Sequence, residues 1–465
     1  MIKKLVSVPV EKNKRYRMQI EDLANAGEGV GKIDGFTVFV EGALPQEEIE
    51  VLIVKVKKQF AYGKLQKIIT PSPKRTEPLC SIFAKCGGCQ LQHLSYEQQL
   101  EYKTKKVTEV LKRIAQIENP TVLPAIGMQN YWRYRNKGQF PVARTKGKLE
   151  IGFYGKRSHR IVDTKKCFLQ REISDEVIKI VRDFLEKYHI SVYDEQSHTG
   201  LIRHILVRVG FTSGQVMVCL VINGNKLPYS DILVKNLQKI KSMTSIVLNE
   251  NKQKTNVILG QKNHLLWGTP FIEDNIGPFV FEISPISFFQ VNPIQTKILY
   301  EKALQMAQLQ GNETVLDLYC GIGTISLFFA QKAKKVIGVE IVPEAIADAK
   351  KNAQKNHIEN TEFLVGAAED IIPLFHQKGM KADVIVVDPP RKGCDEKVIQ
   401  TMIEMNPKKI VYVSCDSATM ARDVNMLKNA GYFLELVQPV DQFPMTNHVE
   451  TVVLMSKVKE KNSEK

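Results

Sequence analysis

The stretch that decides the fold of the C-terminal third is TVLDLYCGIGTISLFFA, residues 314–330. Its apolar start predicts a buried strand, and the turn that follows contains Gly321 and Gly323. Glycines at such a turn let the backbone come close to a ligand at the carboxyl edge of a parallel sheet. An apolar helical pattern follows directly. The stretch therefore predicts a strand, a ligand-binding turn and a helix in succession.

The next strand outward, 335–340, ends in Glu340, about twenty residues beyond the glycine turn. A carboxylate at that place accepts hydrogen bonds from ribose hydroxyls. A glycine turn followed by an acid is typical of many Rossmann-like proteins and fits NAD as well as S-adenosylmethionine. The alternative role for Glu340 is to cap the helix that follows it.

Strands alternate with helices from about Pro285 onward, which predicts a parallel, doubly wound sheet. Another strand of this series ends in Asp388-Pro389-Pro390-Arg391. Prolines lack the amide hydrogen and fix the backbone, so they make a rigid exit from the strand and leave Asp388 at the ligand edge. Nicotinamide dehydrogenases do not need this element, whereas base-modifying methyltransferases commonly carry an acid-Pro-Pro or Asn-Pro-Pro turn there. The alternative is an ordinary turn.

A cysteine stands at the end of a later strand, in IVYVSCD, residues 410–416. A helical pattern follows Cys415, and the positive end of a helix favours thiolate, the form needed for nucleophilic attack. By itself such a cysteine is more often a small buried hydrophobe. Glu450 precedes the last apolar strand, where it is either a base or a surface glutamate, and His448 beside it is assigned a structural role.

The motifs SFFQVN (287–292), DLYCGIGT (317–324), DPPR (388–391), VSCD (413–416) and HVET (448–451) together resemble the RNA uracil-5-methyltransferase family, in particular its bacterial 23S ribosomal RNA members. The resemblance implies a Rossmann-like methyltransferase domain over residues 285–465 that uses S-adenosylmethionine. It also implies roles for matching residues: Cys415 as nucleophile, Glu450 as general base, and as cofactor contacts Gln290, Tyr319, Glu340 and Asp388.

A second group of cysteines, Cys80, Cys86 and Cys89, has the close spacing of metal ligands. Four thiolates hold either zinc or an iron–sulfur cluster, and the spacing alone does not decide between them. Cys167 is chosen as the fourth ligand partly because it matches the family's fourth ligand. The resemblance favours a 4Fe-4S cluster, with a structural or RNA-positioning role. The alternative is a set of unrelated buried cysteines.

The N-terminal residues, about 14–70, show short alternating strands separated by glycine turns, which predicts a small β-barrel. This region resembles a TRAM domain, an OB-like module associated with RNA binding. The expected domains are the barrel at 1–72, a mostly β central RNA-binding domain at 73–284 and the methyltransferase domain at 285–465. By analogy, the barrel favours ribosomal over transfer RNA, because the family's bacterial transfer-RNA members look shorter and lack this module.

The charge of the chain points to an acidic partner. Lys and Arg number 65 against 50 Asp and Glu, a net charge of +15. Between Tyr131 and Glu172 the cations are interleaved with aromatic residues, a pattern suited to phosphates and bases and equally compatible with a solvated basic surface. Within it, Arg133, Arg135 and Lys137 are candidate RNA contacts.

The location and partners follow from the same sequence. Residues 1–13 have no apolar run typical of an export signal, and no stretch is long enough for a membrane span, so we expect a cytoplasmic protein. The expected partner is 23S ribosomal RNA, with no protein partner implied. Two rival functions stay open: an enzyme that methylates cytosine or adenine, and a non-catalytic RNA-binding protein that keeps the fold.

Overall fold

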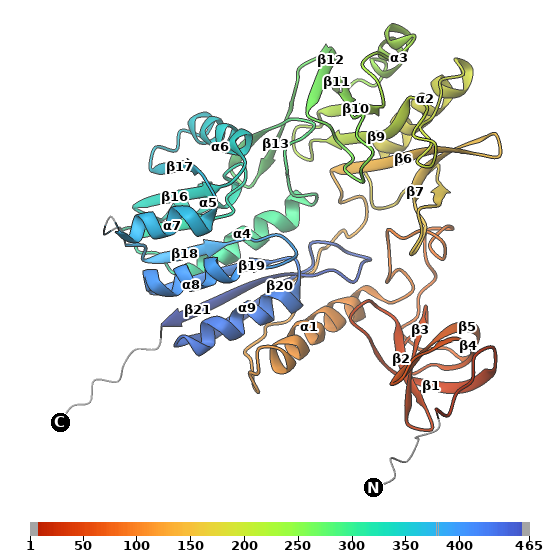
Figure 1. Ribbon diagram of the computed structural model, residues 1–465, viewed down its shortest axis with the longest axis horizontal. Coiled ribbons are helices and arrows are strands. Elements are labelled where there is room, and N and C mark those ends of the chain that lie inside the picture. Colours follow the sequence, from red (N-terminus) through yellow and green to blue (C-terminus); the bar gives the residue numbers. More distant parts are fainter. Residues whose placement is uncertain (1–7, 378, 380, 458–465) are drawn as a thin grey trace.

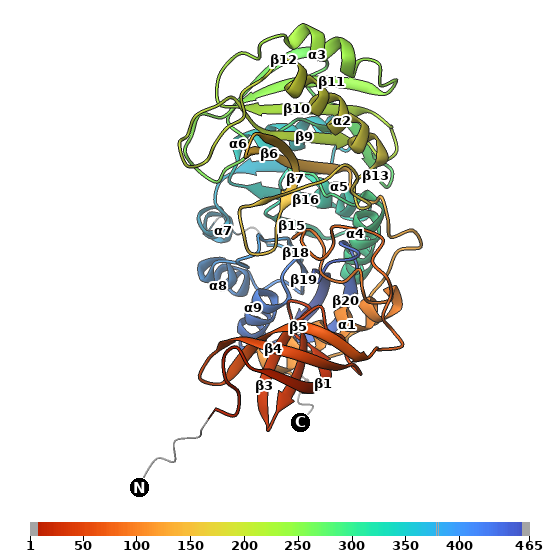
Figure 2. The ribbon, with the colours of Figure 1, turned by 90° about the vertical axis from the view of Figure 1, so that its right-hand side faces the viewer.

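The computed structural model describes residues 8–457 apart from residues 378 and 380. Most of the N-terminal stretch searched for an export signal therefore lies outside the described residues. The chain forms three parts (Figure 1): a red barrel, a yellow-green central sheet and a teal-to-blue C-terminal sheet. Turned by 90°, the barrel and the central sheet lie at opposite ends of the molecule (Figure 2). In the part of the chain that is described, no helix is long and apolar enough to cross a membrane.

The expected N-terminal barrel is confirmed. Its strands, in the closed order β1-β2-β3-β5-β4, are Arg15–Leu23, Gly29–Ile33, Phe36–Glu41, Phe60–Thr70 and Glu48–Val56. Alternate residues point inward, so that Val38, Ile49 and Val51 are fully buried in the barrel core. Gly31 is required where β1 and β2 meet, because a Cβ there would lie 2.0 Å from the carbonyl oxygen of Gln19.

The central sheet has the strand order β12-β11-β10-β9-β6-β7-β8. These strands are Lys262–Gly268, Met243–Glu250, Val216–Ile222, Ile202–Val209, Lys137–Thr145, Lys148–Tyr154 and Ile161–Asp163. Helices α2 (Glu172–Lys187) and α3 (Ser230–Leu237) share one hydrophobic core with this sheet. The domain is thus mostly β, as expected from the sequence, with two helices packed on its sheet.

The C-terminal sheet has the order β17-β16-β15-β18-β19-β21-β20. The strands from β17 to β19 pair in parallel, as predicted, and β21 runs antiparallel between β19 and β20. In this spatial order they are Thr361–Val365, Lys335–Glu340, Thr314–Leu318, Val384–Val387, Lys409–Ser414, Glu450–Lys457 and Tyr432–Val440.

Helices cover both faces of this sheet. One core contains residues from α4 (Pro293–Ala307), α5 (Thr324–Ala330) and α6 (Pro343–Lys355). The other contains residues from α7 (Ala368–Gln377), α8 (Glu396–Met405) and α9 (Ser417–Asn429). The sheet is therefore buried on both sides, which explains why its strands are continuous apolar runs.

The segment assigned by the sequence to the central domain also contributes to the C-terminal core. Helix α1 (Tyr96–Arg113) buries Val107 and Leu111 against the second of these cores. The chain after α1 then runs parallel to β20, with a bridge between Ile126 and Val440. The hairpin β13 (Ile272–Ile276) and β14 (Phe279–Ile283) packs in the first core. Helix α1 thus packs against α9 and β20 of the C-terminal part.

Candidate active site

A cavity of about 680 Å³ lies at the carboxyl ends of the parallel strands. Its volume is within the range of ligand pockets. Six residues predicted from separate motifs all line it: Gln290, Tyr319, Glu340, Asp388, Cys415 and Glu450. The topology brings them together because parallel strands end at one edge of a sheet.

The glycine turn after β15 forms the floor for a ligand. Tyr319 and Gly321 both have left-handed backbone angles, with φ of 66° and 54°. A Cβ added at Gly321 would meet nothing within 4 Å, so the backbone there borders open space. The Glu340 carboxylate accepts hydrogen bonds from the amides of Gly321 (3.2 Å) and Val342 (3.1 Å). Glu340 therefore braces the turn and caps the next segment while it lines the cavity.

Cys415 and Glu450 lie at the same edge of the sheet. In the antiparallel pair β19–β21, Ser414 lies opposite Thr451, and this is the last pair before Cys415. Glu450 is the first residue of β21, and its charge acts on the Cys415 thiol, so the two side chains are near each other. Glu450 is 3% exposed, and Cys415 is half-buried. A thiol and a carboxyl thus face the same cavity from adjacent strands.

The expectation that the helix N-terminus favours thiolate at Cys415 is opposed by the groups around the thiol. Burial and, after it, the charges of Glu450 and Asp388 raise the pKa of Cys415 to about 12, while the charge of Arg391 opposes them. The positive end of α9 is already compensated. Asp416 accepts hydrogen bonds from the amides of Ala418 (3.0 Å) and Thr419 (3.2 Å), so its negative charge offsets the helix dipole.

Two of the carboxyl groups that line the cavity, those of Asp388 and Glu450, also hold their protons unusually tightly. Burial raises the pKa of Asp388 to about 6. Burial raises the pKa of Glu450 well above its ordinary value, Asp388 adds to this effect, and Arg391 opposes it. The cavity therefore favours neutral acids. A carboxyl with a raised pKa is suited to proton transfer near neutral pH.

Arg391 is the functional residue that the sequence reasoning missed. The DPPR motif was quoted without a role for its arginine. In the structure Arg391 lines the cavity, and its charge lowers the pKa of both Cys415 and Glu450. Arg391 therefore provides the positive charge near Cys415 that we expected from the N-terminus of α9. Its position beside Asp388-Pro-Pro was the available signal.

The three candidate RNA contacts differ in their surroundings. The Arg133 guanidinium donates to the carbonyls of Cys167 (2.6 Å) and Gln170 (2.9 Å) and to Asp175 (2.9 Å), so it braces the turn around Cys167. Arg135 and Lys137 instead line a second cavity, and burial lowers the pKa of Lys137 to about 7. An RNA contact at these positions stays a prediction.

The second cavity, of about 360 Å³, is lined by all four predicted metal ligands, Cys80, Cys86, Cys89 and Cys167. Arg391, Phe443 and His448 line both this cavity and the first, so the two adjoin. Burial, with contributions from the other three thiols, raises the pKa of Cys89 to about 12. The four thiols are thus near one another in a cavity that Arg135 and Lys137 also line.

The cysteines do not form a ready-made metal site. Over residues 8–377, 379 and 381–457, no group of three or more His, Cys, Asp or Glu side chains is arranged to hold a metal ion. The expected 4Fe-4S cluster is therefore not shown. The four thiols come from the loops around residues 80–89 and 167, which a bound metal would have to draw together.

Family models match nearly the whole chain. Residues 95–458 match the tRNA (uracil-5-)-methyltransferase model, and residues 9–65 match the TRAM domain. The chain belongs to the tRNA (uracil-5-)-methyltransferase family. The TRAM match coincides with the N-terminal barrel, and the methyltransferase match begins just before α1, which explains why that helix packs with the C-terminal sheet.

Relatives of this family extend over the full chain. An uncharacterized RNA methyltransferase of Clostridium tetani (strain Massachusetts / E88) is 54% identical over 97% of this chain and 98% of its own. Another, from Halalkalibacterium halodurans, is 51% identical over 96% and 98%. A solved Pyrococcus abyssi tRNA (uracil-54, C5)-methyltransferase, in complex with S-adenosyl-L-homocysteine, is 30% identical, with a TM-score of 0.76, over 94% of this chain and 99% of that one.

Proposed function

We propose that this RNA methyltransferase transfers a methyl group from S-adenosylmethionine to carbon-5 of uridine in 23S ribosomal RNA, in the cytoplasm, through a covalent bond to Cys415. The observation that carries the proposal is that Cys415 and Glu450 line one cavity, near enough for the charge of Glu450 to act on the thiol. A nucleophile and a proton acceptor on the same side of a base are what this substitution requires.

The chemistry begins with the thiol. Carbon-5 of uracil is too weak a nucleophile to accept a methyl group unaided. Cys415 gives its proton to solvent, and the thiolate forms a bond to carbon-6, which moves the electron pair of the 5,6 double bond into an enolate. Carbon-5 then forms a bond to the methyl carbon as the bond from that carbon to the sulfonium breaks. The products at this point are neutral S-adenosylhomocysteine and a methylated enzyme–RNA adduct.

Glu450 completes the reaction. Its carboxylate removes the proton of carbon-5, the 5,6 double bond re-forms and the bond from carbon-6 to Cys415 breaks, which returns the thiolate. The raised pKa of Glu450 makes it a stronger base than an exposed glutamate once it is ionised. Arg391, whose charge lowers the pKa of both groups, favours the ionised forms that each step needs.

The donor fits the cavity floor. We assign Gln290, Tyr319, Glu340 and Asp388 as its contacts, with Glu340 facing the ribose beside the open backbone of Gly321. The relative from Pyrococcus abyssi, whose structure contains S-adenosyl-L-homocysteine, supports a donor of this class.

We also propose that the four cysteines hold a 4Fe-4S cluster. All four thiols line one cavity, and a thiolate set is the donor type that such clusters require. Bound there, the cluster would supply a structural cross-link between the loops at residues 80–89 and 167. Arg135 and Lys137, which line the same cavity, are the proposed RNA contacts.

Transfer RNA is the second candidate substrate, and a specific observation favours it. The Pyrococcus abyssi enzyme that matches almost end to end acts on uracil-54 of transfer RNA, as its description states. Because that enzyme matches almost the whole chain, the N-terminal barrel does not by itself favour ribosomal RNA over transfer RNA as the substrate. The proposal of 23S RNA rests on the resemblance of the motifs to the ribosomal RNA members of the family.

Comparing RNA from cells with and without the gene tests the proposal. We expect 5-methyluridine to disappear from one or two positions of 23S RNA while transfer RNA is unchanged. Loss from transfer RNA alone would establish the second candidate. A different methylated base, such as 5-methylcytosine or a methyladenine, would refute uracil chemistry, and unchanged methylation would favour a non-catalytic RNA-binding protein.

A further inference from the structure

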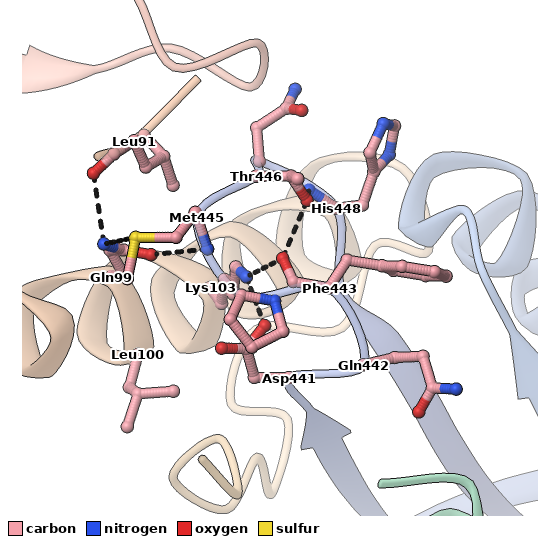
Figure 3. Close-up of polar contacts among 12 residues, drawn as sticks. Leu91, Gln99, Leu100, Lys103, Asp441, Gln442, Phe443, Met445, Thr446 and His448 are labelled. Carbon is pink, nitrogen blue, oxygen red and sulfur yellow. Dashed lines mark hydrogen bonds and ion pairs between the residues drawn. The ribbon is translucent and has the colours of Figure 1, made fainter. Parts of the chain in front are cut away.

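The connection between β20 and β21, residues 441–449, is a buried loop that leads directly into Glu450 (Figure 3). Its Phe443 lines both cavities. Its polar backbone groups are bonded in succession. The carbonyl of Asp441 accepts from Gln295 (3.1 Å), that of Gln442 from Asn292 (3.0 Å) and that of Pro444 from Tyr134 (3.1 Å). This loop is therefore held at several points before the chain reaches Glu450.

The loop contains a strained kink at Met445. Its φ of 68° is in the left-handed region, which is costly for a residue with a long side chain. Three contacts hold it there. The Met445 carbonyl accepts from the amides of Gln90 and Leu91, both at 3.0 Å, and its amide donates to the Gln99 side chain at 3.0 Å. Gln90 and Leu91 follow Cys89 directly, so the cysteine segment touches this loop.

One face of α1 is dedicated to the same loop. Gln99, Lys103 and Lys106 are spaced by four and three residues, which aligns them along a helix. Gln99 reaches Met445, the Lys103 ammonium donates to the carbonyl of Phe443 (3.1 Å), and the Lys106 ammonium donates to the carbonyl of Asn447 (2.9 Å). In Figure 3 the side chains of Gln99 and Lys103 point from the helix toward the loop.

Lys103 also forms an ion pair with Asp441, and both side chains are 0% exposed. The other oxygen of Asp441 accepts from the Tyr96 hydroxyl at 2.8 Å. Burying two charges costs more than an apolar pair of the same shape, so such pairs are poor evidence for stability alone. They do specify one arrangement, because a displaced loop would leave a charge buried without a partner. The ion pair therefore fixes the start of the loop that leads to Glu450 in one position.

We propose that Gln99 and the Lys103–Asp441 pair are positioning residues, which fix the loop 441–449 so that Glu450 and Phe443 face Cys415 correctly. The inference rests on the proposed function, because it assigns these residues to the step in which Glu450 removes the carbon-5 proton. A loosened loop leaves the attack of Cys415 and the methyl transfer possible and delays the proton removal. The methylated covalent adduct then accumulates.

The test uses the full-length protein with methyl-labelled S-adenosylmethionine and an RNA substrate found by the mapping experiment. The double variant Lys103→Met with Asp441→Asn removes both charges together, so no buried charge is left unpaired. Gln99→Leu independently removes the contact between Gln99 and Met445. It still tests the inference if the double variant does not fold. Lys105→Met is the matched control, since Lys105 lies on the same helix but pairs with Asp22 at the surface.

We expect both test variants to bind the donor as the parent protein does, to turn over at least about tenfold more slowly, and to accumulate a labelled adduct that survives denaturation. Lys105→Met is expected to match the parent. Normal turnover of the folded variants, or a loss of turnover without the adduct, would overturn the inference. If Glu450→Gln accumulates the adduct and these variants do not, the proposed function stands and this inference fails. A parent protein that makes no 5-methyluridine refutes the proposed function itself.

Discussion

The two adjoining cavities were built by the chain in different ways. The first draws its residues from the ends of strands in one sheet, where backbone pairing fixes their positions without any ligand. The second draws its four cysteines from loops around residues 80–89 and 167, and no metal-holding group is arranged among them within the described part of the chain. The residues of the first site are positioned by the sheet, whereas those of the second are positioned by loops.

Because the two cavities are built differently, substitutions in them should have different effects. A residue of the first cavity should change chemistry and leave the fold intact, because the sheet does not need it. A cysteine of the second cavity should change the local structure first. The loop 441–449 connects them, since Met445 bonds to the residues after Cys89 and the loop leads into Glu450. Substitutions in each cavity can therefore distinguish a loss of chemistry with an intact fold from a loss of local structure.

Replacing the thiol should give the largest effect. Cys415→Ala is expected to lower methylation by roughly 10⁴-fold or more, because the covalent route needs the Cys415 thiol to add to carbon-6. Binding of S-adenosylmethionine and the melting temperature should stay close to those of the parent. The measurement is methyl transfer to RNA together with donor titration. Cys394→Ala is the matched control, since Cys394 is buried in the connection between β18 and α8 and does not line the cavity. Full activity of Cys415→Ala would exclude the covalent route.

Removing the base should have the next largest effect. Glu450→Gln keeps the size of the side chain and cannot take the carbon-5 proton, so turnover is expected to fall by about 10²–10⁴-fold. Unlike Cys415→Ala, this variant should hold the RNA in a methylated, denaturation-resistant adduct. Gel electrophoresis of labelled enzyme and RNA distinguishes the two. An active Glu450→Gln without an adduct would assign the proton removal to another group.

Much of the fold and of the first cavity was predictable, because both are encoded locally. Apolar runs that end in Glu340, Asp388 and Cys415 predict parallel strands, and parallel strands place their ends along one edge. The barrel was predictable from alternation and glycine turns. Cys80, Cys86 and Cys89 were predictable as a group from their close spacing, whereas Cys167 was chosen partly through the family resemblance.

Other features depend on partners far apart in the chain and have no local signal. Lys103 and Asp441 are 338 residues apart, and a lysine in an amphipathic helix pattern predicts exposure. The pKa of Cys415 depends on Glu450 and Asp388, which only the folded sheet brings to it. The insertion of β21 between β19 and β20 likewise needed the structure, because an apolar strand does not encode its direction.

In the second cavity, Cys89→Ser should act on structure before chemistry. In protein purified without oxygen, we expect loss of the visible absorbance near about 400 nm that iron–sulfur proteins show. We also expect a lower melting temperature, because Gln90 and Leu91 would hold Met445 less firmly. Cys219→Ala is the control, since Cys219 is buried in β10. Equal iron content in both variants, or none in the parent, would remove the cluster from the proposal.

The smallest expected effect is a pH dependence that comes from Asp388 in the first cavity. Burial raises the pKa of Asp388 from 3.8 to about 6, so the folded state binds its proton more tightly than the unfolded state. The resulting stabilisation is full below about pH 4 and is lost as the pH rises through about 6.

The variant Asp388→Asn never ionises at this position. Its melting temperature should therefore gain on that of the parent between pH 4 and 7, by about 2–4 °C for each kcal/mol recovered. Thermal melts across this range measure the difference, and a difference that is constant with pH would contradict the raised pKa. Because Cys89→Ser leaves Asp388 in place, its melting curve should keep the parent's pH dependence, which separates the first cavity from the cysteine loops.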